Sequence, residues 1–400
     1  MNKVIVIGGG ASGLLAALSA KENQSDVMIL ERNNKLGKKI LATGNGRCNF
    51  TNVDATEMHY NHPYFVKPVF EQMTPKKTLA YFESLGVIPK VESEGKTYPL
   101  SEQASSIVDV LVYEIERLAI PVIYEAKVVG IKKNQDFEIT LEDGRILHAD
   151  KVILATGGMA MPKSGSDGIG YELALSLGHT MTSIFPALVK LELESPYLKA
   201  MDGVKFPGTV ELIYHGASIQ TEQGDVLFTK YGISGPTILQ ISRKANALLQ
   251  DNQLIELKVV LVNGPEKRDI AKRFSLLSEK TAEQSLIGLI NKRLIHPILK
   301  DVHIEPHVLI KQVNKEKLNL LIQRLFDWRF KVIGSKDFDD AQVTAGGLSI
   351  HEFNPQTLQS KKVSGLFVCG EVIDIDGLCG GYNLQWAWAS GYVAGKHASQ

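Results

Sequence analysis

The stretch that decides the fold is VIVIGGGASG, residues 4–13. Its first four residues, Val4–Ile7, form a continuous β-branched run, which is typical of a parallel strand buried on both faces. A glycine turn follows, and small and apolar residues then recur at helical spacing up to Ala20. Residues 27–30 are again continuously apolar. The first thirty residues therefore predict strand, glycine turn, helix and strand, which is one βαβ unit of an α/β domain.

The glycine turn has the spacing of a dinucleotide-binding fingerprint. Gly8 permits a tight turn, Gly10 lets a pyrophosphate approach the backbone, and Gly13 lets the helix pack closely on the strand. The helix N-terminus adds free N–H groups and the positive end of a dipole. Glu31 lies 23 residues beyond Gly8, where a carboxylate can accept the ribose hydroxyls of an adenosine. The alternative is a glycine-rich turn in another α/β protein, which the flanking strand and helix disfavour.

Two later segments extend the predicted site. The sequence ATGG, residues 155–158, closes a strand that we expect beside the first. Gly370-Glu371 and Gly381 then offer a carboxylate and the start of another helix near Asn383. An extended FAD needs such a distributed site, with Glu371 on a ribityl hydroxyl and the helix N-terminus directed at the flavin N1–C2=O region. The alternative for Glu371 is a solvated loop carboxylate.

The hydrophobic pattern changes in the middle of the chain. Residues 187–262 alternate apolar and polar side chains between glycine turns, which favours an antiparallel sheet or small barrel. Helical spacing then covers residues 270–277, 282–294 and 315–326, and strands return after Phe330. This order predicts a nucleotide-binding domain that is interrupted by an insertion and completed by the C-terminal segment.

The composition excludes several classes of protein. Acidic and basic residues number 44 each in 400, so wholesale attraction to nucleic acid or to a membrane is not predicted from the total. The three cysteines contain no C-x-x-C pair and the ten histidines show no ligand spacing, so we expect neither a disulfide framework nor a metal site. No apolar run is long enough to span a bilayer, and we expect a cytoplasmic protein without a membrane partner.

Several longer motifs carry a resemblance to a known family. They are GKKILATGNGRCN at residues 37–49, TN at 51–52, FTKYGISGP at 228–236, TAGG at 344–347 and DIDGLCGGYNLQ at 374–385. With these motifs the chain resembles, over its whole length, the BaiN/RdsA family of FAD-dependent, NAD(P)H-linked oxidoreductases. Because no second G-x-G-x-x-G motif follows a strand, NADH or NADPH is expected to dock transiently as a small-molecule reductant.

The resemblance also implies a domain arrangement. A Rossmann-like FAD-binding domain would comprise residues 1–186 and 344–400. An inserted β-barrel would comprise residues 187–264 and 328–343, and a helical domain, residues 265–327, would be inserted within that barrel. The expected fold class is therefore α/β with nested insertions.

The glycine motifs and the family resemblance together imply a set of FAD ligands. They are Gly8, Gly10, Ala11, Ser12, Gly13, Glu31, Arg32, Lys38, Thr43, Gly44, Asn45, Arg47, Cys48, Asn49, Val128, Ala155, Thr156, Gly157, Gly158, Gly370, Glu371, Gly381, Asn383 and Leu384. Within this set, the glycines around Asn45 let the backbone approach a ligand, and Arg47 could neutralise the pyrophosphate or the reduced flavin. Lys38 and Lys39 could reach phosphate, or at least one of them could face water.

The sequence does not assign the catalytic residues. Tyr382, Cys379 and Arg47 are candidates only through their nearness to the flavin motifs. Cys48 and Cys379 are not a redox C-x-x-C pair, so small packing roles are favoured for both. A disulfide-reductase mechanism is accordingly disfavoured.

Family resemblance implies two substrates, a steroid-like enone and a uridine of 23S rRNA, each reduced at a carbon–carbon double bond. The charge distribution favours RNA, because residues 265–336 hold 15 basic and 8 acidic residues, a net +7 that leaves −7 for the rest. The aromatic residues Phe274, Trp328 and Phe330 lie among these charges. For the basic segment, the alternative to RNA binding is an ordinary solvated helical face. For the protein as a whole, the alternatives to an RNA-modifying reductase are a small-molecule enone reductase and a non-catalytic FAD-binding protein.

Overall fold

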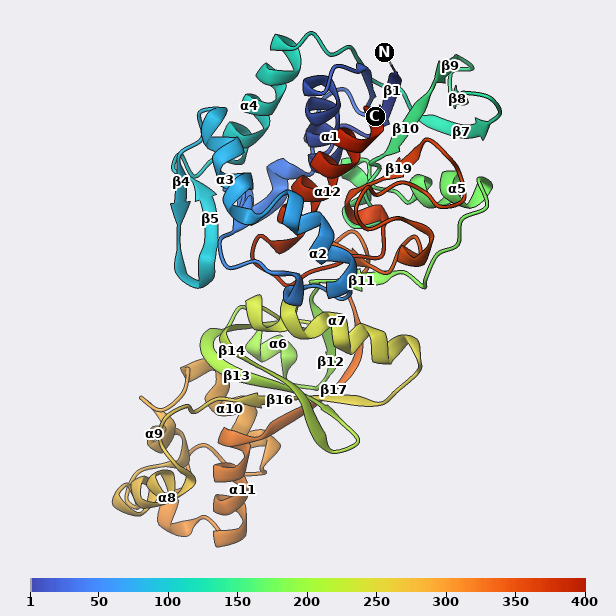
Figure 1. Cartoon of the computed structure of the whole chain (residues 1–400). Coiled ribbons are helices and arrows are strands. Elements are labelled where there is room, and N and C mark those ends of the chain that lie inside the picture. The colour runs from blue at the N-terminus through green and yellow to red at the C-terminus, as the bar shows by residue number, and fades with distance from the viewer. Residues whose placement is uncertain (1) are drawn as a thin grey trace. The chain divides into compact units, whose positions relative to one another are not determined.

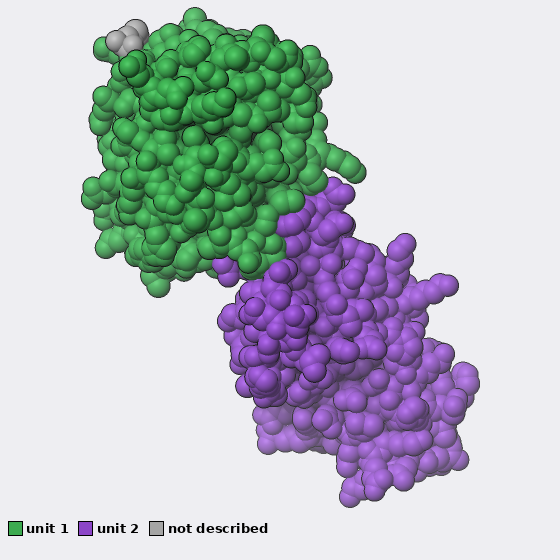
Figure 2. Space-filling model, turned by 90° about the vertical axis from the view of Figure 1, so that its right-hand side faces the viewer, with its two compact units in different colours: residues 1–185, 342–400 green, residues 186–341 purple. Residues whose placement is uncertain are grey.

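The computed structural model describes residues 2–400, which form two compact units (Figures 1 and 2). Unit 1 combines the residues up to Phe185 with Gln342–Gln400, and unit 2 is Pro186–Ala341. The chain passes from the first unit to the second within β11 (Phe185–Ala187). Unit 1 is therefore discontinuous in sequence and has an α/β architecture, which confirms the predicted fold class at this level.

A parallel sheet forms the centre of unit 1. Its strand order is β19 (Leu366–Val368), β10 (Lys151–Leu154), β1 (Lys3–Ile7), β2 (Asp26–Leu30) and β6 (Val122–Ile123), and every neighbouring pair is parallel. The β-branched run of β1 is buried on both faces, as its composition predicts. The chain turns from β1 to β2 on one side and reaches β10 on the other. The carboxyl ends of these strands thus form a switch point, where open α/β sheets bind ligands.

Two helices cross in close contact over this sheet. Figure 1 shows α1 (Ala11–Glu22), in blue, beside α12 (Tyr382–Ala398), in red. A Cβ at Gly391 or at Gly395 would overlap backbone carbonyl oxygens of α1. The two glycines therefore set the distance between the first and last helices of the chain, and with it the place where α12 begins.

The remaining elements of unit 1 surround this centre. The helices are α2 (Pro63–Gln72), α3 (Pro75–Ser84), α4 (Ala104–Arg117) and α5 (Ile169–Ser176), and the strands are β3 (Thr51–Asn52), β4 (Pro89–Val91), β5 (Lys96–Pro99), β7 (Val128–Lys133), β8 (Phe137–Leu141), β9 (Ile146–Ala149) and β18 (Val343–Ala345). Two of the sheets they form are antiparallel, β3-β5-β4 and β7-β8-β9.

Unit 2 contains a closed barrel with its own core. The strand order is β12 (Leu191–Glu194), β15 (Gly232–Ser234), β14 (Ala217–Thr229), β13 (Lys205–Tyr214), β16 (Ile255–Val260) and β17 (Trp328–Ser335). Trp328 and Phe330 of β17 pack with Phe228 of β14 inside the barrel. Phe274, in the helical segment, is also fully buried. These aromatic residues are core residues, so the idea that Phe274, Trp328 and Phe330 support an RNA surface is wrong.

Helices complete unit 2. They are α6 (Leu198–Met201), α7 (Pro236–Gln250), α8 (Lys267–Leu276), α9 (Ala282–Leu286), α10 (Lys292–Asp301) and α11 (Lys315–Phe326), the last four lying between β16 and β17 in sequence. The continuous helix predicted over residues 282–294 is wrong, because Gly288 has φ +77° and separates α9 from α10. Within residues 2–400 no helix has the length and hydropathy needed to cross a membrane.

The helix α7 lies in a stretch that the sequence pattern assigned to strands. Its apolar residues Ile238, Ile241 and Ala245 follow helical spacing and are fully buried. Pro236 at its first position follows Gly235, a combination that favours a helix start. These signals were present in the sequence, but the alternating strands on both sides concealed them.

A buried polar network fixes the segment that precedes β19. His179 Nδ1 lies 2.8 Å from Glu352 Oε2, and its Nε2 lies 3.0 Å from Ser360 Oγ. The imidazole therefore donates to the carboxylate and accepts from the hydroxyl. Glu352 also accepts hydrogen bonds from Lys362 and from the N–H and hydroxyl of Thr180. The carboxylate of Glu352 thus ties together two segments that are far apart in sequence.

Glu352 is expected to contribute stability that depends on pH. Partial burial opposes ionisation, but hydrogen bonds from Lys362, Thr180 and His179 outweigh it and lower the pKa of Glu352 to about 2. Since the unfolded chain takes up this proton near pH 4.5, the stability is complete above that pH and is lost as the pH falls toward 2. We expect Glu352→Gln to lower the free energy of unfolding at neutral pH by about 1.5–3 kcal/mol.

Urea unfolding of the wild type and of Glu352→Gln, at neutral pH and at about pH 3, tests this prediction. The difference between the two proteins should shrink at the lower pH. Glu172→Gln, which removes an exposed carboxylate from α5, is the matched control and should leave the free energy of unfolding unchanged. A difference that is the same at both pH values would contradict the account.

Candidate flavin-binding site

At two positions of the turn between β1 and α1, the neighbouring backbone leaves no room for a side chain, so glycine is required there. Gly8 has φ +107°, and a Cβ there would overlap the carbonyl oxygen of Ala155. A Cβ at Gly13 would overlap the carbonyl oxygen of Gly8, so the helix and the strand touch at this point. The tight turn and the close packing that the sequence predicts are therefore present in the backbone.

At Gly10, by contrast, the surrounding chain would tolerate a side chain. Its φ of −84° and ψ of −167° suit any residue, and a Cβ there would meet no atom within 4 Å. The first turn of α1 borders this open space with N–H groups that have no acceptor within the helix. A glycine that keeps the space open fits a phosphate group, which approaches the backbone closely at a helix N-terminus. The turn thus fits the pyrophosphate of a dinucleotide. Ala11 and Ser12 follow at the start of α1.

Glu31 lies at the end of β2 and is 6% exposed. Its Oε2 accepts a hydrogen bond from the Gly9 N–H at 2.8 Å. Its Oε1 accepts from the backbone N–H and the side-chain amide of Asn33, both at 2.7 Å. These three donors fix the carboxylate beside the glycine turn and leave part of its acceptor capacity available. A carboxylate held in this position suits the ribose of an adenosine.

The segment formed by Ala155, Thr156, Gly157 and Gly158 continues β10 next to this turn. The Ala155 N–H donates to the carbonyl oxygen of Ile7 at 2.9 Å. A Cβ at Gly158 would lie 2.5 Å from Thr344 Oγ1. This oxygen accepts hydrogen bonds from the backbone N–H groups of Met159 and Ala160 at 2.8 and 2.9 Å. Thr344 belongs to this site although it is not among the ligands predicted from the sequence. Its signal was the TAGG stretch at residues 344–347.

Glu371 is held by two partners and is not a solvated loop carboxylate. Its Oε1 accepts from the Thr344 N–H at 2.6 Å, and its Oε2 lies 2.7 Å from Lys39 Nζ. Gly370, the residue before it, has φ +78°, and a Cβ there would lie 2.5 Å from Ser12 Oγ in α1. These contacts bring the late segment of the chain to the first turn of α1. Lys39, expected at phosphate or in water, pairs with Glu371.

Residues 43–49 form a tight loop. The backbone is left-handed at Gly44, Asn45 and Cys48, with φ of +57°, +55° and +57°. The Thr43 hydroxyl donates back to Ile40 O at 2.6 Å, and at the other end Asn49 Oδ1 accepts from Thr97 N–H at 3.0 Å. The side chains at both ends therefore hold the loop, while Asn45 at its tip is exposed.

Arg47 is engaged by other residues of unit 1. Its Nη2 lies 2.6 Å from Glu92 Oε1 and 3.2 Å from Glu102 Oε1. The guanidinium also lies 4.1 Å from the centre of the Tyr98 ring. Two carboxylates and an aromatic face thus compensate the charge that the sequence analysis assigned to the pyrophosphate or reduced flavin. In this structure Arg47 braces the loop through these contacts.

The start of α12 is also built by glycine. Gly381 has φ +94°, and a Cβ there would overlap the carbonyl oxygen of Thr51. Asn383 holds the preceding loop: its Oδ1 accepts from the Gly377 N–H and its Nδ2 donates to the Gly377 carbonyl, both at 2.9 Å. The first-turn N–H groups of α12, including that of Leu384, remain as the positive end of a 17-residue helix.

The side chains considered for proton transfer are protonated at neutral pH. Burial raises the pKa of the Tyr382 hydroxyl and of the Cys379 thiol. Tyr382 also stacks on His59, with ring centroids 4.8 Å apart. Cys48 is fully buried, and burial raises the pKa of its thiol to about 12. Cys48 is therefore a packing residue, whereas Tyr382 and Cys379 each hold a proton beside the start of α12.

Three predicted ligands make contacts elsewhere in unit 1. Arg32 Nη1 lies 2.5 Å from Asp167 Oδ2, which ties the end of β2 to the loop before α5. Lys38 Nζ donates to Asn33 Oδ1 at 3.3 Å, next to Glu31. Val128 is a buried residue of β7, in the antiparallel sheet. Lys38 thus lies near the Glu31 carboxylate through Asn33, while Arg32 and Val128 have structural contacts.

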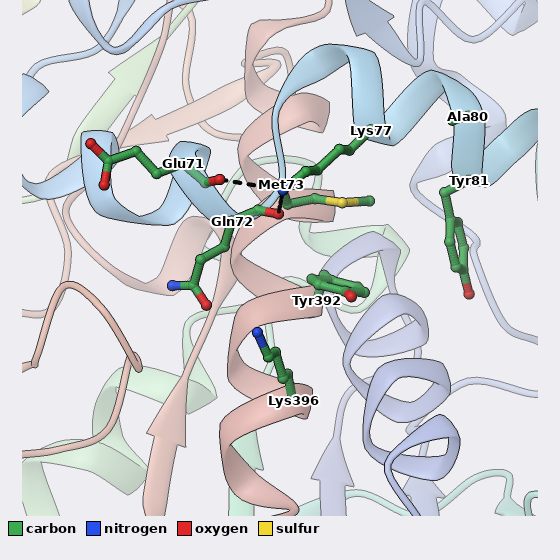
Figure 3. A pocket seen from close by; sticks show the side chains of 8 residues that line it. All are labelled: Glu71, Gln72, Met73, Lys77, Ala80, Tyr81, Tyr392 and Lys396. Carbon is green, nitrogen blue, oxygen red and sulfur yellow. Dashed lines mark hydrogen bonds between the residues drawn. The ribbon is translucent and has the colours of Figure 1, made fainter.

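A hollow of about 480 Å³ lies between α2, α3 and α12, away from these motifs (Figure 3). It is lined by Glu71, Gln72, Met73, Lys77, Ala80, Tyr81, Tyr392 and Lys396. Lys77 Nζ donates to the carbonyl oxygen of Gln72 at 2.8 Å and so caps the end of α2. None of the lining residues belongs to the predicted site, and the hollow is a separate feature of unit 1.

The fold and the site define a Rossmann-type FAD-binding domain of an oxidoreductase. A family model described as "HI0933-like protein Rossmann domain" matches residues 2–397. The chain belongs to this HI0933-like family, and the predicted BaiN/RdsA resemblance is confirmed.

Similar proteins share the whole length of the chain. The 3-dehydro-bile acid delta(4,6)-reductase of Clostridium scindens is 38% identical, with 100% of both chains covered. The ribosomal RNA dihydrouridine synthase of Haemophilus influenzae is 29% identical, with 99% of this chain and 98% of that protein covered. The solved 3-ketosteroid-delta4-(5alpha)-dehydrogenase of Rhodococcus jostii RHA1 has a TM-score of 0.50 at 15% identity, covering 100% of this chain and 97% of that one. This last likeness concerns the fold alone.

Proposed function

We propose that the chain uses NADH or NADPH to reduce an electron-poor carbon–carbon double bond at a bound FAD. The observation that carries the proposal is the junction of three distant segments at the first turn of α1. Thr344 contacts the loop after β10, Glu371 accepts from Thr344, and Gly370 lies against Ser12. Together with the open space at Gly10, this junction offers one extended site, as a long dinucleotide requires.

Each part of the site has a role toward FAD. The first-turn N–H groups of α1 would bind the pyrophosphate, and Glu31 would bind the adenosine ribose. Glu371, fixed by Lys39, would accept a ribityl hydroxyl. The start of α12 would place its positive end where negative charge develops on the flavin. The other ligands predicted from the sequence are proposed to line the same site, except Arg32, Cys48 and Val128, which have structural contacts. Bound FAD, once reduced by NADH or NADPH, would supply a hydride for the double bond.

The chain's own residues would supply the accompanying proton. Tyr382 and Cys379 flank the start of α12, and burial keeps both protonated by raising the pKa of each group. Arg47 keeps its proton, because its hydrogen bond with Glu92 raises the pKa of the guanidinium. We therefore propose Tyr382 Oη or Cys379 Sγ as the proton donor and Arg47 as a positioning residue.

For the substrate, we propose a uridine of ribosomal RNA, which a relative 29% identical over almost the whole chain acts on by name. The positive charge of residues 265–336 supports this substrate. The second candidate is a steroid-like enone, favoured by the 38% identity to the bile acid reductase. In this proposal the barrel and the helices between β16 and β17 form the nested domains expected over residues 187–343, and they serve the substrate and not the cofactor.

The reductive half-reaction tests the proposal. The purified protein should be yellow, release FAD on denaturation, and lose its flavin absorbance when NADH or NADPH is added without oxygen. Comparison of the two nucleotides also gives the preferred reductant. A yellow protein that neither nucleotide reduces would indicate a non-catalytic FAD-binding protein. A colourless protein that takes up no FAD would reject the proposal altogether.

A further inference from the structure

The helix α10 has one buried face and one basic face. Leu294, Ile295, Ile298 and Leu299 are buried in the core of unit 2. On the opposite side, Lys292, Arg293, His296 and Lys300 are exposed, at the spacing of one helical face. We call these four residues the α10 basic face. At about 1.5 Å per residue the face extends roughly 12 Å along the helix.

The two lysines of this face are not neutralised. Within residues 2–400 neither Lys292 nor Lys300 makes an ion pair, whereas Lys311 and Lys331 of the same unit lie within 3.3 Å of Glu279 and Glu194. The face contains no acidic residue between its first and last positions. Lys292 and Lys300 therefore contribute a positive field that the protein does not cancel.

Two carboxylates near the face contact neither of its lysines nor Arg293. Glu283 Oε1 lies 3.1 Å from His296 Nε2, at the middle of the face. Asp301, which follows Lys300, accepts from Arg324 Nε at 2.8 Å. Among residues 2–400, Glu283 is the one carboxylate that forms an ion pair with the face, and its partner is His296, so the charges of the two lysines and Arg293 are not compensated.

Arginines elsewhere in the helical segment have structural roles. Arg273 donates to the carbonyl oxygens of Ser285 and Ile287 at 3.0–3.3 Å and so fixes the end of α9. Within the described residues the guanidinium of Arg293, by contrast, makes one long contact, 3.4 Å from Nη2 to the carbonyl oxygen of Ala200. Arg273 therefore does not belong to the exposed charge of the segment, which includes Lys267, Lys272, Lys280 and Lys315 besides the α10 basic face.

We infer that the α10 basic face binds the phosphate backbone of the RNA substrate. The inference rests on the proposed function, since it assigns a docking surface to the substrate of that reaction. Charge complementarity favours RNA: a row of exposed cations on a rigid helix matches closely spaced phosphates, and such contacts need no base readout. Phe274, Trp328 and Phe330 are buried and are not available for base stacking, so the inferred contact is electrostatic.

Binding of an unmodified ribosomal RNA transcript to the full-length protein tests the inference. We expect roughly 100-fold weaker binding than the wild type, at about 0.1 M salt, for the triple variant Lys292→Gln/Arg293→Gln/Lys300→Gln. This estimate assumes that each of the three lost phosphate contacts weakens binding roughly 5-fold. The slope of log K against log salt should also shrink by about 2–3. The matched control, Lys76→Gln/Lys132→Gln/Lys230→Gln, removes three exposed charges elsewhere and should keep affinity and slope.

An affinity and slope that do not change in the triple variant would overturn the inference. Equal losses in both triple variants would overturn it as well, because they would show a response to net charge alone. So would binding of the wild type to phosphatidylserine vesicles but not to the transcript. Reduction of the wild-type flavin by NADH or NADPH is measured separately, so failure of the proposed function is distinguishable from failure of this docking surface.

Discussion

The substitution Gly10→Val is expected to weaken FAD binding by roughly 100-fold or more, about 3 kcal/mol, without unfolding the protein. A valine suits the backbone angles at this position, and its Cβ would meet no atom of the chain within 4 Å. The free energy of unfolding of the FAD-free protein should therefore change by about 1 kcal/mol or less. The methyl groups would occupy the space before the first turn of α1, from which the pyrophosphate would be excluded.

Gly13→Ala is the contrasting control. Its Cβ would overlap the carbonyl oxygen of Gly8, so we expect it to destabilise the FAD-free protein by about 1–3 kcal/mol. Isothermal titration of FAD and urea unfolding of the FAD-free protein separate the two effects. If Gly10→Val bound FAD as tightly as the wild type, the assignment of the pyrophosphate to this turn would fail.

The substitution Gly395→Ala is expected to destabilise the fold, although alanine is the better helix former. Helix propensity alone predicts a gain of about 1 kcal/mol. A Cβ at this position, however, would overlap the carbonyl oxygen of Ala16, which belongs to the backbone of α1 and cannot rotate away. We expect the overlap to exceed the gain and to lower the free energy of unfolding by about 2 kcal/mol net.

Chemical unfolding of Gly395→Ala measures this effect. Lys396→Ala is the neighbouring control, because its side chain lines the hollow of Figure 3. It should change the free energy of unfolding by about 0.5 kcal/mol or less. Since α12 carries Gly381 and Tyr382 at its start, Gly395→Ala should also weaken FAD binding. A stabilised Gly395→Ala protein would show that the crossing is looser than the structure indicates.

Local sequence patterns predicted the first βαβ unit of the chain, formed by β1, α1 and β2, correctly. The β-branched run Val4–Ile7 and the glycine spacing determine the strand, the turn and the helix through interactions between near neighbours. The place of Glu31 beside the glycine turn was predicted in the same way, because its distance from the turn follows from the length of one βαβ unit. The fold class and the place of the nucleotide-binding turn could therefore be predicted from residues close together in the chain.

Contacts between distant segments could not be predicted. Nothing near Lys39 or Glu371 shows that the two side chains pair, since the contact depends on how the last segment returns to α1. The partners of Arg47 are unpredictable for the same reason, because Glu92 and Glu102 reach it through folding of the intervening chain. The aromatic residues of unit 2 show a further limit, because composition alone does not distinguish a stacking surface from a core.

A single anaerobic turnover tests the central claim most directly. The protein is loaded with FAD, reduced with one equivalent of NADH or NADPH, and mixed without oxygen with an unmodified ribosomal RNA transcript or with a steroid-like enone. The account predicts that one of the two substrates restores the flavin absorbance and gains two hydrogens across one double bond for each flavin reoxidised. A flavin that stays reduced with both substrates until oxygen is admitted would contradict it.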